Sequence, residues 1–275
     1  LLTFDHAVSW QGRSIKLYTG PGLEQWTPLT INRVGTGGSE LAAAWLSREL
    51  AALGHSVSIV GPSRGVYDGV SYCQQLAIRA DDVLVSSRIP ELFAQPLSCH
   101  TKILWMHDID CADHLTPEIA SQLSAIIVLS HWHLEHIQRV YPWLKECRVI
   151  DKGWPASYHD EQPRPVFYLD GKCTHPPVLV VLPHAIYPQR FSQVVAKHMY
   201  QFIWASAADR GLVQLLELWP QILAWQPTAT LKIFYGWEYF DKYIAAAPQL
   251  SDIKARVQKL SSQPGVQWCG RVGQD

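Results

Sequence analysis

The sequence predicts an α/β protein with two parallel sheets, one in each half of the chain. Two observations lead to this prediction. Short apolar runs rich in β-branched residues alternate with longer stretches of helical periodicity. The alternation is interrupted between Gly153 and Pro177 and resumes at Gln201. Open parallel sheets bind ligands at the carboxyl ends of their strands, so the turns after the strands are where functional residues are expected.

The first half is expected to contain six strands. They span Ser14–Tyr18, Ser56–Val60, Asp82–Ser86, Lys102–Trp105, Ala125–Leu129 and Arg148–Ile150. A long loop should follow the first strand up to a glycine cluster at Gly35–Gly38. A helix should then run from Ser39 to a stop at Gly54. Ser130 is expected to cap a helix over His131–Arg139, because its hydroxyl can accept from the first free backbone N–H groups.

A second series of elements is expected in the last third of the chain, after a buried-strand pattern at Val178–Leu182. The series comprises strand Gln201–Ala205, helix Gly211–Ala224, strand Thr230–Tyr235, helices Tyr239–Ala246 and Asp252–Leu260, and strand Val266–Cys269. The stretch Gly153–Pro177 is rich in Pro, Gly, Asp and His, which predicts an irregular insertion or connection. The expected domains are residues 1–185 and 186–275.

Composition narrows the classes of function. The chain has 275 residues, 48% hydrophobic and 17% charged, and a formal net charge of -1. A broad nucleic-acid surface needs a basic excess, so no nucleic-acid partner is expected. The cysteines form no C-x-x-C pair, which argues against structural zinc and favours free thiols in a reducing cytoplasm. No apolar run approaches the roughly 20 residues of a membrane span, so any membrane contact should be peripheral.

Residues Gly37, Gly38, Ser39 and Glu40 stand where a loop leads into a helix. Glycines let a backbone approach a ligand, and free N–H groups of a first helical turn attract anions, which suits donor phosphates or sugar oxygens. The alternative is a turn with only a structural role. A dinucleotide cofactor fits badly, because Glu40 replaces the third glycine of its fingerprint and Gly61–Ser63 stands where an acid is required.

His107 and Asp108 follow the expected strand Lys102–Trp105. A histidine there can donate to a sugar hydroxyl or stand near a reacting centre. The alternative is a loop histidine whose partners are backbone groups. A metal cluster of His107, Asp108, Asp110 and His114 follows no spacing rule, so no metal is expected.

A second histidine group, His131, His133 and His136, lies within one expected helix. Residues spaced by two and by five positions point to different sides of a helix. These three side chains are therefore expected at the solvated surface.

In the second half, Arg210 and Gly211 join a strand to a helix. A guanidinium at a helix start can reinforce backbone donors around a diphosphate, and the alternative is an exposed arginine paired with Asp209. Gly236 ends the next strand, and Val272 lies just beyond the last one. All of these turns are expected on the same rim of the second sheet, where they could line one cleft.

Taken together, the segments resemble family-4-type retaining glycosyltransferases of the GT-B fold. The resemblance extends over nearly the whole chain. Its residues are Tyr18–Pro21, Glu24, Trp26, Pro28, Gly37–Ala42, Ser87, Arg88, Pro90, Trp105, His107, Asp108, Ala205, Ser206, Asp209–Leu212, Tyr235–Trp237 and Gly270–Gly273.

The resemblance implies an N-terminal Rossmann-like domain on the acceptor side and a C-terminal one that binds a nucleotide-sugar donor. It also implies that His107 contacts the transferred sugar, that Gly37 and Gly38 approach the donor phosphates, and that Val272 meets the nucleobase through its backbone. Arg210 would replace the lysine that neutralises the diphosphate. The implied reaction is a hexosyltransferase-like, metal-independent transfer to a carbohydrate, lipid-linked or protein acceptor, with no cofactor beyond the donor.

Three departures from the family pattern qualify these expectations. The stretch Gly153–Pro177 is longer than the family's normal linker. In the region around Arg210 the family usually has two basic residues. Here only Arg210 remains, because Ala205 and Ser206 occupy the place of the earlier one. The chain also ends at Asp275, before the two glutamates that hold the donor in the family. The resemblance therefore predicts a C-terminally truncated piece, with an incomplete second domain and little activity of its own. The alternative function is a non-catalytic GT-B-like module that binds a glycan or a protein.

Overall fold

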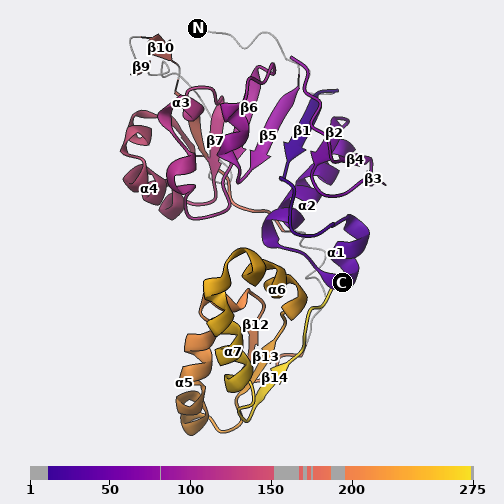
Figure 1. Cartoon of the computed structure of the whole chain (residues 1–275), viewed down its shortest axis with the longest axis vertical. Helices are drawn as coiled ribbons and strands as arrows, with labels where there is room; N and C mark the ends of the chain where they lie inside the picture. Colours follow the sequence, from indigo (N-terminus) through magenta and orange to yellow (C-terminus); the bar gives the residue numbers. More distant parts are fainter. Residues whose placement is uncertain are drawn as a thin grey trace. The chain divides into compact units, whose positions relative to one another are not determined.

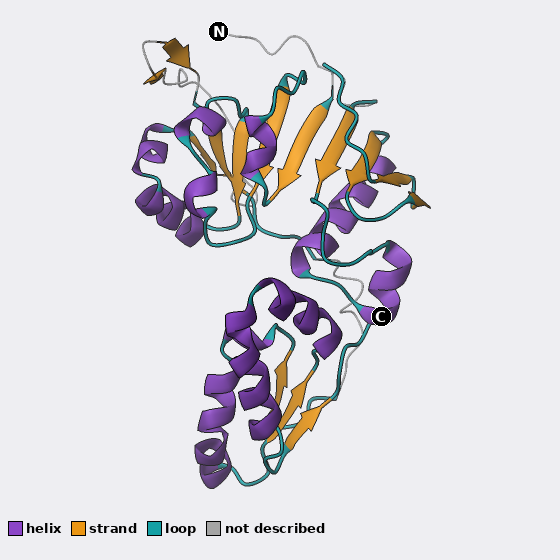
Figure 2. Cartoon of the chain, in the orientation of Figure 1, coloured by secondary structure: helices purple, strands orange, loops and turns teal. Residues whose placement is uncertain are grey.

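The computed structural model describes residues 12–80, 82–151, 167–169, 172–174, 176–186 and 196–273. The chain divides into two compact units (Figure 1). Unit 1 comprises Leu1–Gly22 and Gly37–Ile186, and unit 2 comprises Leu23–Thr36 and Tyr187–Asp275. Both units combine helices with a parallel sheet (Figure 2). The segment Leu23–Thr36, called the strap below, leaves unit 1 after its first strand and belongs to unit 2.

Unit 1 contains a nine-stranded sheet in the order β3-β4-β2-β1-β5-β6-β7-β11-β8. Its strands are β1 Ser14–Tyr18, β2 Ser56–Val60, β3 Gly65–Tyr67, β4 Val70–Cys73, β5 Val83–Ser87, β6 Thr101–Trp105, β7 Ala125–Val128, β8 Val149–Asp151 and β11 Val178–Val181. Every pairing is parallel except that of β3 with β4. Leu17, Leu84 and Leu104 are fully buried at its centre, as expected for a parallel sheet covered on both faces. The predicted parallel sheet is confirmed, with two strands added at one edge: β4, parallel to β2, and β3, antiparallel to β4.

The helices of unit 1 are α2 Gly38–Ala52, α3 Pro117–Ala120 and α4 His131–Val140. Helix α2 packs against β2 and β4, and α4 packs against β7 and β11. The predicted cap of α4 is confirmed, because Ser130 Oγ accepts from the backbone N–H of His133 at 3.1 Å. Short 3₁₀ turns at Pro90–Ala94 (η1), Ala112–His114 (η2) and Pro142–Glu146 (η3) join these elements.

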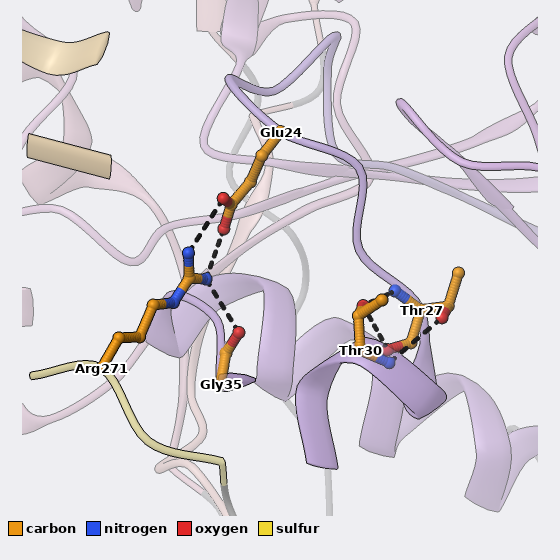
Figure 3. A network of polar contacts seen from close by, with 5 residues as sticks. All are labelled: Glu24, Thr27, Thr30, Gly35 and Arg271. Carbon is orange, nitrogen blue, oxygen red and sulfur yellow. Dashed lines mark hydrogen bonds and ion pairs between the residues drawn. The ribbon is translucent and has the colours of Figure 1, made fainter. Parts of the chain in front are cut away.

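The long loop predicted after β1 is wrong in one part, because Pro28–Val34 form helix α1. Thr27 and Thr30 build a capping box at its start: the Thr27 hydroxyl accepts from the Thr30 N–H at 3.3 Å, and the Thr30 hydroxyl accepts from the Thr27 N–H at 2.7 Å (Figure 3). Proline suits the first turn of a helix because its missing N–H would be unpaired there. A seven-residue helix is too short for periodicity to reveal it.

Two short hairpins also differ from the predictions. Strands β3 and β4 pair antiparallel in a region that was expected to contain no strand. Strands β9 Phe167–Leu169 and β10 Lys172–Thr174 form another antiparallel pair inside the expected irregular stretch Gly153–Pro177. Most of that stretch lies outside the described residues. Strands of three or four residues are too short for alternation to identify them.

Unit 2 contains a three-stranded parallel sheet of β12 Gln201–Trp204, β13 Thr230–Ile233 and β14 Val266–Trp268. Helices α5 Leu212–Trp225 and α7 Ser251–Leu260 pack against each other beside this sheet, and α6 Trp237–Ala246 follows β13 (Figure 1). The remaining turns are η5 Ala208–Arg210 and η6 Pro248–Leu250. The second parallel series is therefore confirmed. In the described part of the chain, no helix has the length and apolar character of a membrane span.

Candidate functional site

The strand order of unit 1 contains a switch point between β1 and β5. From β1 the chain continues to β2 on one side, whereas β5 begins the series on the other side. Ligands of open α/β sheets bind at the carboxyl ends of the strands at such a point. The turns that reach this edge are the start of α2 and the turn after β5. They are joined by a hydrogen bond, in which Arg88 Nη1 donates to Ser39 Oγ at 3.1 Å.

Arg88 is the central side chain of this edge. Its φ of 73° lies in the left-handed region, which non-glycine residues seldom adopt. The turn holds it there: the Arg88 N–H donates to the Trp105 carbonyl at 3.0 Å, and Ser86 Oγ donates to the Ile89 carbonyl at 2.7 Å. From this position Arg88 Nε donates to Asp108 Oδ2 at 2.6 Å. Such strain persists where surrounding contacts enforce it, and it occurs often at functional sites.

The start of α2 holds the four predicted residues Gly37 to Glu40. No side chain caps the helix at Gly37. Instead, the Glu40 carboxylate folds back against Gly37, where an added Cβ would overlap it, and it accepts from Ser39 Oγ at 3.0 Å. A carboxylate is favourable beside the positive end of a helix dipole. The chain's own Glu40 carboxylate therefore lies at the first turn of α2, where an anion was expected.

His107 follows β6 at the same edge and is half-buried. Its Nδ1 lies 3.0 Å from His184 Nε2, and its ring is 4.4 Å from that of Trp105. Among the described residues no group hydrogen-bonds its buried Nε2. Burial, then His184 and Arg88, lower the pKa of His107 to about 4, against an opposing effect of Asp108. At neutral pH His107 is therefore an uncharged imidazole whose buried Nε2 has no partner among the described residues.

The loop that carries His107 and Asp108 is held by contacts with α4 and with Tyr141, the residue after it. The Tyr141 hydroxyl donates to the Ala112 carbonyl at 2.8 Å and accepts from the Cys111 N–H at 2.9 Å. Asp110 contacts His136 Nε2 at 3.5 Å. These contacts come from α4 and the residue after it, so the loop is tied to a packed helix and offers its polar residues in a set position.

The four residues weighed as a metal cluster have separate partners. Asp108 is paired with Arg88, Asp110 with His136, and His114 with Glu91, whose Oε1 lies 2.8 Å from His114 Nδ1. Among the residues with described positions, no group of three or more His, Cys, Asp or Glu is arranged to hold a metal ion.

The expectation that His131, His133 and His136 are solvated is wrong for His133. This side chain is 5% exposed, and its Nδ1 accepts from the Leu129 N–H at 3.3 Å. Burial lowers its pKa. His131 is exposed and lies 3.2 Å from Asp151, as predicted for a surface residue. The prediction failed because the ring of His133 caps the end of β7, a tertiary role that helical spacing does not reveal.

In unit 2, Arg210 is the last residue of η5, and Gly211 joins this turn to α5. Gly211 has a φ of 104° and occupies the cap position of the helix. The Arg210 side chain is 63% exposed, and its Nε lies 3.9 Å from Asp209 Oδ2. This is the pairing weighed as the alternative to a diphosphate contact.

Gly236 and Val272 lie beside Arg271, which was not among the predicted site residues. Arg271 donates to both carboxylate oxygens of Glu24, at 3.0 and 2.5 Å, and to the Gly35 carbonyl at 2.8 Å (Figure 3). Gly236 caps α6, and the Val272 carbonyl lies against Gly35. The strap is thereby fastened to the turn after β14. Residues 247 positions apart make this pair, and no local pattern marks it.

The fold defines the class of this chain as an α/β protein with two parallel sheets, compatible with Rossmann-like folds. A comparison with models of known protein families found no match, and a comparison with curated protein sequences found none either. A functional assignment therefore depends on the geometry of the edge around Arg88 and His107.

Proposed function

We propose that this chain belongs to a nucleotide-sugar-dependent glycosyltransferase of the GT-B type, which transfers a sugar to an acceptor hydroxyl with retention of configuration. One observation carries the proposal. At the switch point of the sheet, Arg88 joins the start of α2 to Asp108, beside a neutral His107 whose buried Nε2 has no partner among the described residues. A sugar presents many hydroxyls at fixed angles, and such a cluster of donors and acceptors is suited to orient it.

In this proposal His107 and Asp108 contact the transferred sugar. Asp108 keeps a second carboxylate oxygen for a hydroxyl, and His107 offers Nε2. The first turn of α2, with Gly37 and Gly38, receives a donor phosphate when Glu40 moves aside. Catalysis of this kind depends on orienting the reactants and on stabilising the departing diphosphate.

Unit 2 is assigned the nucleotide side of the donor. Arg210 is exposed at the start of a 14-residue helix, where its charge and the backbone N–H groups can both act on a diphosphate. Gly236 and Val272 lie in the strand-end turns proposed to meet the nucleoside. The acceptor is a carbohydrate, a lipid-linked sugar or a protein, and membrane contact is at most peripheral in a cytoplasmic protein.

The test is ligand binding measured by titration calorimetry and saturation-transfer NMR on a panel of nucleoside diphosphates and nucleotide sugars. We expect at least one nucleotide sugar to bind. His107→Ala should weaken that ligand roughly tenfold, the loss of about one hydrogen bond, without weakening the matching nucleoside diphosphate. Arg210→Ala should weaken both. His100→Ala, an exposed histidine at the other end of β6, serves as the control. Failure of every nucleotide sugar to bind would contradict the proposal.

A non-catalytic glycan-binding module is the alternative, and one observation favours it. Arg88 is paired with Asp108, and Glu40 occupies the start of α2, so both groups reduce the attraction of this edge for a diphosphate. Such a module would bind free glycans equally well with and without nucleotide. A glycan array probed in both conditions separates the two functions.

A further inference from the structure

The pair formed by His107 and His184 determines what the site offers to a ligand. His107 Nδ1 and His184 Nε2 are 3.0 Å apart, and both belong to unit 1. The Trp105 ring lies against both, with ring centroids 4.4 and 5.8 Å away. At this separation one nitrogen must carry a proton and the other must not, because two facing N–H groups would repel each other.

Both rings are uncharged at neutral pH. Burial lowers the pKa of His184, and the pKa of His107 falls to about 4. Arg88 and His133 also oppose a proton on His107, while Asp108 favours one. Each ring therefore carries a single proton, and the pair has two arrangements.

The two arrangements differ in the tautomers that they require. If His184 donates, both rings carry their proton on Nε2. If His107 donates, both rings carry it on Nδ1. A neutral histidine side chain intrinsically prefers the Nε2–H form, so the first arrangement places both rings in their preferred tautomer. The hydrogen bond then runs from His184 Nε2 to His107 Nδ1.

We propose that His184 is a positioning residue that fixes His107 in its Nε2–H tautomer, so that His107 presents a neutral N–H donor to an acceptor oxygen of the ligand. The buried Nε2 has no partner among the described residues, and a buried unsatisfied donor is unfavourable. A hydroxyl or phosphate oxygen removes that cost, whereas an ammonium group cannot. The nature of this ligand rests on the proposed function, but the tautomer does not.

The tautomer is read directly by long-range ¹H–¹⁵N NMR of the histidine-labelled chain at neutral pH, with no ligand present. We expect the Nε2–H pattern for His107. His184→Leu should leave His107 with only its intrinsic preference, so that a minor Nδ1–H population appears beside the Nε2–H form. His184→Gln, whose amide N–H can reach a similar place, should keep the Nε2–H form alone. His100→Leu controls for the loss of an exposed histidine. An Nδ1–H pattern in the unaltered chain, or an unchanged pattern in His184→Leu, overturns the proposal.

Binding of the nucleotide sugars above provides the second measurement. His184→Leu should weaken the sugar-bearing ligand roughly tenfold, and His184→Gln should restore most of the affinity. If no nucleotide sugar binds but the tautomer responds as stated, the proposed function fails and the role of His184 stands. If a sugar binds and its affinity is the same in His184→Leu, the role of His184 fails alone.

Discussion

The carboxyl edges of the two sheets are built from different contacts. In unit 1 the edge is joined by side chains: Arg88 holds Ser39 and Asp108, and His107 contacts His184. In unit 2 the turn after β14 is joined mainly to backbone and to one carboxylate, because Arg271 holds Glu24 and the Gly35 carbonyl (Figure 3). Both edges contain an arginine, yet the two arginines have different surroundings.

The two arginines therefore have different roles: the pair in unit 1 is accessible to a ligand, and the pair in unit 2 is structural. The Arg88 and Asp108 side chains remain 42% and 45% exposed, so a ligand can reach them. The Arg271 and Glu24 side chains are 24% and 19% exposed, and their pairing fixes the strap in unit 2. Changes at the edge of unit 1 should therefore affect ligand binding more than stability, and changes at the strap should do the reverse.

The largest effect is expected from Gly35→Ala. Gly35 has φ 74° and ψ 175°, a conformation almost restricted to glycine, and an added Cβ would lie 2.7 Å from the Val272 carbonyl oxygen. The substitution should lower the free energy of unfolding of unit 2 by about 3–4 kcal/mol, measured by urea denaturation. Gly38→Ala is the matched control, because no atom of the described residues lies within 4 Å of its added Cβ. Equal effects of the two substitutions would contradict this account of the strap.

Arg271→Ala should be the next most damaging. It leaves the Glu24 carboxylate and the Gly35 carbonyl without this donor in a half-buried place, at a cost of about 2–3 kcal/mol. Arg271→Lys keeps the charge but loses the two-pronged contact, so its loss should be intermediate. Thermal unfolding followed by tryptophan fluorescence measures both. If Arg271→Ala reduced the affinity for the unit 1 ligand more than it reduced stability, the structural role assigned to Arg271 would be wrong.

The third prediction is that His107 makes the stability of unit 1 depend on pH. The pKa of His107 is lowered from 6.5 to about 4, so between these pH values the unfolded chain binds a proton that the folded chain does not. Stability is therefore complete above pH 6.5 and is lost as the pH falls toward 4. The loss attributable to His107 should be about 2 kcal/mol, after allowance for partial exposure. Urea titrations of the unaltered chain and of His107→Gln across this range give the difference.

Much of the fold could be predicted because its longer elements have clear periodicity. Strands such as Ser14–Tyr18 and helices such as Leu212–Trp225 lie within a few residues of their predicted bounds. Helix Pro28–Val34 was missed, although the threonine box before it is a local signal. The assignment of the strap to unit 2 depends on contacts between distant segments, which one sequence does not reveal.

The sequence indicated where the candidate site lies along the chain, but not which side chains contact each other there. Strand ends indicated His107 and Asp108, since parallel strands bring their carboxyl ends to one edge. The partners could not be predicted, because Arg88 reaches Ser39 across 49 residues and His184 reaches His107 across 77. The place of Glu40 at the start of α2 follows from a side-chain conformation, and residue spacing carries no information about it.

The smallest effect on stability is expected from Arg88→Gly. This substitution separates the backbone strain at residue 88 from the contribution of its side chain to ligand binding. Glycine adopts the φ of 73° without cost, so the change should recover about 1 kcal/mol of strain and lose a comparable amount with the half-exposed pair to Asp108. The free energy of unfolding should change by less than about 0.5 kcal/mol.

Arg88→Ala removes the same pair but keeps the strained φ, and it should destabilise unit 1 by about 1 kcal/mol. Both variants should lose ligand affinity equally, because both lack the guanidinium that joins Ser39 to Asp108. Urea denaturation and calorimetric binding of the two variants test this. If Arg88→Gly were the less stable of the two, the backbone strain assigned to Arg88 would be contradicted.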